Sequence, residues 1–532
     1  MQRSLYSDRC SRNRYLLYLA KLVNKVLERL RNRLASVNIE SALQAIWYYY
    51  QHIVNGGVLP SSLRGPSEIK ETLQIWQLLL LLREVVRCSR LDANEDFSYH
   101  TFAHSMNDIT DIIDDLDAQR IKAGNADLIL RDMNSLAHQQ FRFQTTLDIA
   151  AMLRYFRIFG SEEVDVLLKR KVGINFAQCY FFMLRLVSNF DKQPGIVNNQ
   201  GYEDFGISAE AATKFYGWVS SSVEELRLKL DSGEELSVNW ALTWNPLEAF
   251  PLIRHDPSHP ERMYCPIPLL VWHKLSSGLF YDLVNEKGFS KVYGGAFEKY
   301  VGQFAHSQLP GPIFGVTAAQ PYIVAKQRKD GADWMIDDKD AAIFVECKTK
   351  RISHAAKLVG NDAALGEQLA VLADAVVQLY KNIQDSRSGF NSWDPLSRKV
   401  YPLVVTLENW YLFSPSVKLD LNHLVASKLL DAGLDTKLVQ ELPFTIASCQ
   451  EYEWLILAIR KNGINSLLQP KVDDTHFDWM LAPFLQTYFG HDIGSSTAEA
   501  YAKPWKDLLL AASDSWSPWA KQRLQIDFDV DS

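Results

Sequence analysis

The chain has 532 residues, a formal net charge of −7 from 56 Lys and Arg against 63 Asp and Glu, 47% apolar residues and 22% charged residues. These values are typical of globular proteins and exclude a mostly disordered chain, a collagen-like fibre and a coiled-coil rod. They also exclude a protein that coats nucleic acid through bulk positive charge, so any nucleic-acid site must be local. At roughly 150 residues per domain, the length predicts about three or four domains.

We expect neither a membrane span nor a secretory leader. The longest apolar cluster, five leucines at 78–82, is closed by Arg83 and Glu84, whereas a span needs about 20 apolar residues. Charged residues interrupt the N-terminal segment, so no signal-peptide core forms. The six cysteines are scattered without a CxxC pair, which is typical of free thiols in a reducing compartment. The sequence therefore predicts a cytoplasmic protein that does not contact membranes.

Residues 1–230 are expected to form a helical N-terminal domain. Apolar residues recur there at spacings of three and four, the pattern of helices that bury one face. The segments with this pattern are 16–30, 41–52, 69–88, 101–121 and 146–159. Residues 231–290 begin with the turn sequence Asp-Ser-Gly and contain six prolines, which predicts a proline-rich connecting region.

Residues 291–415 mix helix and strand patterns, and residues 416–532 are again mainly helical. In chain order, the elements expected in the mixed segment are a helix over 294–309, a strand over 322–326, a hairpin of two strands around a polar turn at 337–340, a helix over 365–383 and a strand over 400–407. This order predicts one α/β domain between two helical regions.

The hairpin carries the most specific chemical signal. Side chains alternate between the two faces of a strand, so Glu346 and Lys348 point the same way and Cys347 points the opposite way. Pairing of the two strands brings Asp333 beside Glu346. An exposed ion pair at the hairpin edge would be worth only about 0–1 kcal/mol. These charges instead interrupt an apolar strand, where buried charges are rare unless they are paired or bound to metal.

The motif formed by Asp333 and then Glu346-Cys347-Lys348 resembles that of the PD-(D/E)xK nuclease superfamily, which includes restriction endonucleases. The proline of the motif is missing here. The resemblance covers residues 291–415 and implies an α/β restriction-endonuclease-like core of a helix, three strands, a helix and a fourth strand. Mainly α-helical N- and C-terminal regions would flank this core.

The resemblance also implies roles for individual residues. Asp333 and Glu346 would bind Mg²⁺, which prefers oxygen ligands, and Mn²⁺ is a substitute. The backbone carbonyl of Cys347 would be a further ligand. Lys348 would hold the attacking water and stabilise the phosphate oxygens.

Two further residues follow from the resemblance alone. Glu298, in the helix over 294–309, would support a second metal ion or orient Lys348; the alternative is an exposed glutamate paired with Lys299. Gln378, in the helix over 365–383, would brace the site. Tyr380 stands only two residues after it, so the four-residue Gln–Tyr spacing of some relatives is absent.

These observations together predict a Mg²⁺-dependent endonuclease that acts on DNA, with a role in phage defence or restriction by analogy of fold alone. A homodimer or a protein partner from a defence system would fit this role. Two alternatives remain open at the level of the sequence. One is a non-catalytic nucleic-acid-binding or scaffold protein on a nuclease-like fold, and the other is a nuclease directed at RNA.

Overall fold

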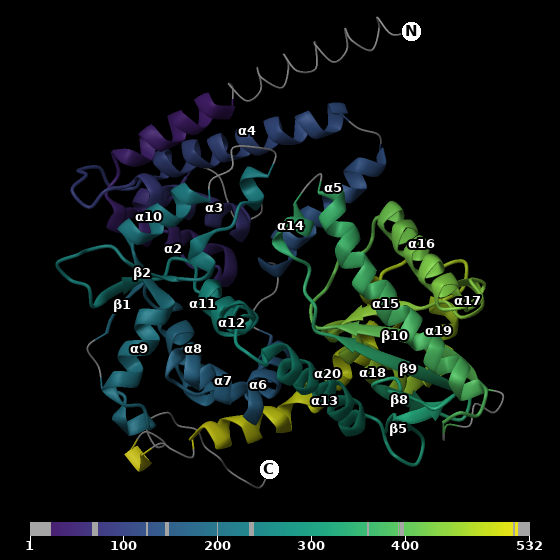
Figure 1. Ribbon diagram of the computed structural model, residues 1–532. Helices are drawn as coiled ribbons and strands as arrows, with labels where there is room; N and C mark the ends of the chain where they lie inside the picture. The colour runs from purple at the N-terminus through teal and green to yellow at the C-terminus, as the bar shows by residue number, and fades with distance from the viewer. Residues whose placement is uncertain are drawn as a thin grey trace, which may run out of the picture.

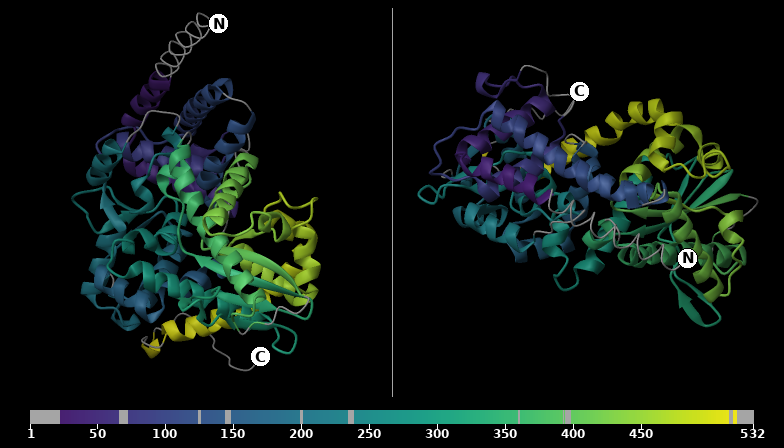
Figure 2. Two further views of the ribbon diagram at one scale, coloured as in Figure 1. Left: turned by 45° about the vertical axis from the view of Figure 1, so that its right-hand side comes forward. Right: turned by 90° about the horizontal axis from the view of Figure 1, so that it is seen from above.

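The computed structural model in Figure 1 describes residues 23–65, 73–123, 126–143, 148–198, 201–233, 239–358, 361–391, 393, 398–513 and 517–519. The protein is a mixed α/β structure. Its N-terminal helices lie on one side, and a five-stranded sheet with its covering helices lies on the other (Figures 1 and 2).

Helices dominate the N-terminal region. They are α2 (Ile39–Asn55), α3 (Ile75–Cys88), α4 (Tyr99–Ala123), α5 (Ala126–Gln140), α6 (Ile149–Phe159), α7 (Glu162–Val172), α8 (Phe176–Phe190), α9 (Ala209–Val219) and α10 (Val223–Ser232). Short 3₁₀ turns are η1 (Ser61–Leu63), η2 (Phe141–Phe143), η3 (Glu203–Phe205), η4 (Trp240–Leu242) and η5 (Pro246–Glu248). Four expected helical segments correspond to α2, α3, α4 and α6; residues 69–72 and 146–147 of these segments lie outside the described residues. Of the segment 16–30, residues 16–22 lie outside the described residues, and 23–30 are helical.

The proline-rich segment contains regular structure and packs with the N-terminal helices. Its strands β3 (Leu252–Arg254) and β4 (Arg262–Tyr264) join β1 (Gly195–Val197) and β2 (Ser220–Ser222) in a four-stranded sheet of order β1-β4-β3-β2. Helices α11 (Leu269–Leu275) and α12 (Leu279–Leu283) follow. The segment expected as a connection therefore belongs to the N-terminal body of the molecule.

The larger sheet has the strand order β11-β10-β9-β8-β5. Its strands are β5 (Gly315–Ala318), β8 (Trp334–Asp337), β9 (Ala341–Lys348), β10 (Lys399–Thr406) and β11 (Thr445–Ser448). The strands β5, β8 and β9 form an antiparallel meander, and β9, β10 and β11 run parallel. The expected hairpin is confirmed: Trp334 pairs with Val345, and Asp338 Oδ1 accepts hydrogen bonds from the amides of Asp340 and Ala341 at 2.9 Å in the turn.

The two faces of β9 are covered by different helices, as the expected alternation requires. Ile343 and Val345 belong to the large core that also contains side chains of α13 (Phe289–Gln308). Phe344 belongs to a second core with side chains of α15 (Asp362–Arg387). In Figure 1 the sheet lies between α15 and the layer formed by α13 and α18. Because both faces are buried, β9 is apolar along most of its length.

One expected strand was wrong. Residues 322–326 do not enter the large sheet; Tyr322–Val324 (β6) pairs only with Gln327–Lys329 (β7) in a separate hairpin. Its two turn residues, Ala325 and Lys326, have positive φ of 48° and 67°, as a tight hairpin turn requires. The first strand of the sheet is β5, only four residues long, with a partly exposed pattern that periodicity does not detect.

The C-terminal region is mainly helical, as expected, but it also completes the sheet. Its elements besides β11 are α16 (Pro415–Asp431), α17 (Leu438–Glu441), α18 (Cys449–Asn462), α19 (Ile464–Lys471) and α20 (Leu481–Ser513); the short α14 (His354–Lys357) precedes α15. The sheet thus extends beyond residues 291–415. Among the described residues, no helix is both long and apolar enough to cross a membrane.

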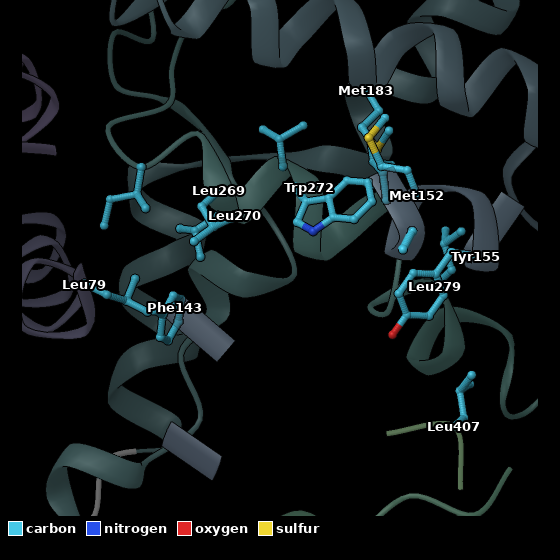
Figure 3. Close-up of a cluster of buried hydrophobic side chains, with 14 of the residues drawn as sticks. Leu79, Phe143, Met152, Tyr155, Met183, Leu269, Leu270, Trp272, Leu279 and Leu407 are labelled. Carbon is cyan, nitrogen blue, oxygen red and sulfur yellow. The ribbon is translucent and has the colours of Figure 1, made fainter. Parts of the chain in front are cut away.

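The N-terminal helices and the sheet share one hydrophobic core. Figure 3 shows part of it, with Tyr155 of α6 and Leu407, the residue after β10, among the side chains of this core. Helix α20 contacts α18 on one side and α6 and α8 on the other (Figure 2). The carboxyl ends of β9 and β10 therefore meet the N-terminal body of the molecule.

Candidate active site

Asp333 immediately precedes β8, at the end of the hairpin opposite its turn. Its Oδ2 accepts a hydrogen bond from the backbone amide of Cys347 at 2.6 Å, so the carboxylate is fixed to the neighbouring strand. Burial raises the pKa of Asp333, although this hydrogen bond and the nearby charge of Lys348 oppose the shift. The expected approach of Asp333 to the Glu346-Cys347-Lys348 segment is present.

Glu346 is a buried carboxylate whose two oxygens differ in their hydrogen bonding. Its Oε1 accepts a hydrogen bond from Lys348 Nζ at 2.6 Å, while Oε2 is buried without a hydrogen-bond partner. The residue is 2% exposed. Burial is the main cause that raises its pKa to about 7, and the charge of Asp333 adds to the shift. A buried carboxylate oxygen without a donor is costly and points to a missing partner.

Glu298 reaches the same site from helix α13. It is half-buried, and burial followed by the charge of Asp333 raises its pKa. The charge of Glu298 in turn contributes to the raised pKa of Glu346. Since these effects act over short range, the three carboxylates lie in one electrostatic neighbourhood.

A glycine allows α13 to approach the hairpin so closely. Trp334 Nε1 donates a hydrogen bond to the carbonyl of Glu298 at 2.8 Å, and its ring lies against Gly302, one turn further along the helix. A Cβ atom at Gly302 would come within 2.0 Å of the Trp334 ring. The pair of Gly302 and Trp334 thus positions Glu298 beside the end of β8.

Lys348 is the last residue of β9 and lies opposite Thr406 of β10. Its side chain is 27% exposed, so the ammonium group can be reached from solvent while it contacts the buried Glu346. The ligand role expected for the carbonyl of Cys347 stays a prediction. The backbone amide of Cys347, by contrast, donates a hydrogen bond to the Asp333 carboxylate.

Gln378 lies on α15, which covers one face of the sheet, and its side chain is half-buried. Val376 on α15 packs with Phe344 of the sheet, and Gln378 stands two residues later, about 200° around the helix. Tyr380 donates its hydroxyl hydrogen to the carbonyl of Leu442 and is buried in the core. The bracing role expected for Gln378 stays a prediction.

The chemistry of the site fits a hard divalent cation. Its free donors are carboxylate oxygens, the ligands that Mg²⁺ and Mn²⁺ accept, and the orphaned Oε2 of Glu346 is the strongest single indication. A cation would also relieve the mutual repulsion that raises the pKa values of these carboxylates. In the part of the chain that the structure describes, however, no three His, Cys, Asp or Glu side chains are already gathered as a metal-binding group.

The sequence did not predict the ion pair between Arg351 and Glu408 beside the site. Arg351, three positions after Lys348, is buried. It forms an ion pair with Glu408 Oε1 at 3.0 Å and donates a hydrogen bond to the carbonyl of Ser277 at 2.8 Å. Its guanidinium lies over the ring of Phe280 at 4.4 Å. In the sequence Arg351 ends a basic run, which usually indicates an exposed surface. Its partners come from distant segments, so no local pattern could identify them.

Comparison with known proteins gives no further information about the site. No protein-family model, curated protein or solved structure matches the chain. The resemblance to PD-(D/E)xK nucleases therefore rests on the motif residues and the order of elements alone.

Proposed function

We propose that this protein is a metal-dependent endonuclease that hydrolyses phosphodiester bonds, with DNA as its substrate. Glu346 is the observation that supports it most: one oxygen is bound to Lys348, and the other is buried without a partner. Keeping such a group in the interior costs several kcal/mol of solvation free energy. A residue with a purely structural role has no need of a buried, unpaired carboxylate oxygen. A residue that binds a cation together with Asp333 needs one.

Each residue of the site has a task in this proposal. Asp333 and Glu346 would hold Mg²⁺, which when bound neutralises charge on the phosphate and makes a water more acidic. The ammonium of Lys348 would orient the attacking water and donate hydrogen bonds to the phosphate oxygens. Glu298 would take a second cation or orient Lys348.

A comparison of substrates and metals tests the proposal. Duplex DNA, single-stranded DNA and RNA are incubated with the full chain in Mg²⁺, Mn²⁺ or EDTA, and cleavage is followed on gels. We expect DNA cleavage in Mg²⁺ and Mn²⁺ that is lost in EDTA and in Lys348→Met. Lys339→Met is the matched control, because Lys339 is 88% exposed in the turn at the far end of the same hairpin.

A non-catalytic nucleic-acid-binding role is the second candidate, and one observation favours it. Among the described residues the acidic side chains do not yet form a metal-binding group, and Lys348 directly neutralises one oxygen of Glu346. Titration calorimetry separates the two candidates. The nuclease requires Mg²⁺ or Mn²⁺ binding that Glu346→Gln abolishes, whereas the non-catalytic protein requires none.

The biological setting remains part of the proposal. A role in phage defence or restriction rests on analogy with the superfamily. One site of this kind cuts one strand, so cleavage of duplex DNA on both strands would call for two copies of the chain. Cleavage of RNA but not DNA in the same assay would move the substrate to RNA and leave the roles of the residues unchanged.

A further inference from the structure

The carboxyl end of the large sheet meets the N-terminal helices at a junction rich in charged and aromatic groups. Helix α14 contacts α5 directly. Tyr411, which follows β10, lies edge-on to His138 at 4.8 Å and to Phe141 at 5.3 Å. Figure 1 shows α5, α14 and the end of β10 converging on this region. Lys348 and Thr406 end β9 and β10 here, so the junction adjoins the candidate active site.

Two carboxylates at the junction are already neutralised. Arg142 of η2 donates to both oxygens of Glu248 in η5, at 2.6 and 2.7 Å. Arg351 forms an ion pair with Glu408 at 3.0 Å. Each pair satisfies its own acid, so neither carboxylate needs a further cation.

Lys357, the last residue of α14, is the additional cation. Its pKa is lowered chiefly by burial; the charges of Glu408 and Glu248 oppose that shift, and those of Arg142 and Arg351 add to it. Lys357 therefore lies within electrostatic reach of both ion pairs. In the described part of the chain, no hydrogen bond or ion pair engages its ammonium group. Three cations face two carboxylates, which leaves an excess of one positive charge.

Two histidines that face the junction do not change this balance. Burial is the main cause that lowers the pKa of His138 to about 3 and of His273 to about 4, so both imidazoles are neutral near pH 7. Arg351 also keeps one buried donor, Nε, without a partner. The junction thus offers two cationic donors without partners among the described residues, the Lys357 ammonium and Arg351 Nε.

Exposed aromatic rings stand beside these cations. Tyr281 is 59% exposed and lies near Arg351, whose guanidinium is 5.5 Å from its ring centre. Phe141 is 42% exposed and precedes Arg142, whose side chain is 41% exposed. Cations that take phosphates, next to rings on which unpaired bases stack, are the combination by which proteins bind single-stranded nucleic acid.

We propose that this junction binds a single strand of DNA and leads it to the candidate active site. Lys357 would contact a backbone phosphate, and Tyr281 and Phe141 would stack on bases. The N-terminal body is then part of the substrate site. The inference rests on the proposed nuclease function, and it narrows the substrate from DNA to its single-stranded form.

Fluorescence anisotropy with the full chain and a short labelled DNA strand tests the inference. The measurement is made in EDTA, so that affinity is read without cleavage. We expect Lys357→Met to weaken binding by about tenfold, as loss of one charge-assisted contact does. The slope of log affinity against log salt should fall by about 0.7, the value for one phosphate contact on a single strand. Lys357→Arg should restore both, and Lys339→Met should behave as the wild type.

Three results would overturn the inference. One is unchanged affinity in Lys357→Met, and another is equal displacement of the label by duplex and single-stranded DNA. The third is displacement by inorganic phosphate or a nucleoside monophosphate at the same concentration, which would indicate a site for a small phosphate ligand. Failure of the proposed function gives a different result. If the chain binds the strand through Lys357 but cleaves nothing in Mg²⁺ or Mn²⁺, the binding inference holds and the nuclease proposal is wrong.

Discussion

Arg154 of α6 and Glu453 of α18 form a buried two-point ion pair across 299 residues of sequence, with both N–O distances at 2.7 Å. Glu453 also accepts hydrogen bonds from the hydroxyls of Tyr300 and Tyr501, on α13 and α20. One carboxylate therefore joins the N-terminal helices to the layer beneath the sheet. This connection holds the N-terminal helices against the layer that covers the sheet, as the junction proposed at Lys357 requires.

Loss of this ion pair should destabilise the protein strongly. Glu453→Gln leaves the Arg154 guanidinium buried without a counter-charge, which costs about 3–5 kcal/mol of unfolding free energy. Urea unfolding followed by circular dichroism measures the change. Glu499→Gln is the control, since the pair of Arg460 and Glu499 joins α18 and α20 at the surface and is worth about 0–1 kcal/mol. Equal effects of the two substitutions would contradict the role given to Glu453.

The raised pKa of Glu346 predicts how stability depends on pH. The folded state holds this proton up to about pH 7, whereas the unfolded chain releases it near the ordinary value of 4.5. Stability from this group is therefore complete below pH 4.5 and is lost as the pH rises through 7. The shift corresponds to about 3 kcal/mol at most.

Glu346→Gln removes this titration, so the variant should gain stability relative to the wild type between pH 4.5 and 7. Denaturant unfolding at several pH values checks this. Because a cation favours the charged carboxylate, Mg²⁺ should raise the melting temperature of the wild type at pH 8 more than at pH 5. A stability difference that is flat with pH would show that Glu346 is not a strained, buried acid.

Gly302 predicts a packing effect that reaches the site. Gly302→Ala places a Cβ within 2.0 Å of the Trp334 ring, so the ring must move and its hydrogen bond to Glu298 is disturbed. We expect a loss of about 1–3 kcal/mol in stability and reduced cleavage. Gly295→Ala, on the same helix with nothing within 4 Å, should instead stabilise by roughly 0.5–1 kcal/mol. Thermal melting of the two variants provides the comparison.

The sequence predicted the parts of the fold that a local pattern specifies. The alternation over residues 341–348 set the two faces of β9, and the polar turn set the hairpin register that brings Asp333 to Cys347. The apolar stripe over residues 365–383 predicted helix α15.

Features that depend on contacts between distant segments could not be predicted from local sequence patterns. The four residues of β5 carry too little periodicity to compete with the stronger pattern at 322–326. The strand β11 belongs to a region that is otherwise helical. The grouping of Lys357 with Arg142 and Glu408 requires three segments that only tertiary packing brings together. The features that were missed form the edges of the sheet and the junction, whereas the hairpin carries the residues of the candidate site.

Cleavage by Asp333→Asn tests the central claim most directly. Single-stranded DNA is incubated in Mg²⁺ with the wild type, with Asp333→Asn and with Asp340→Asn, which changes an exposed carboxylate in the turn at the far end of the same hairpin. All three proteins should melt as folded chains. We predict cleavage by the wild type and Asp340→Asn, and a loss of at least about a hundredfold in Asp333→Asn, as when a group that stabilises the transition state is removed. Equal cleavage by Asp333→Asn and the wild type would contradict the assignment of this site.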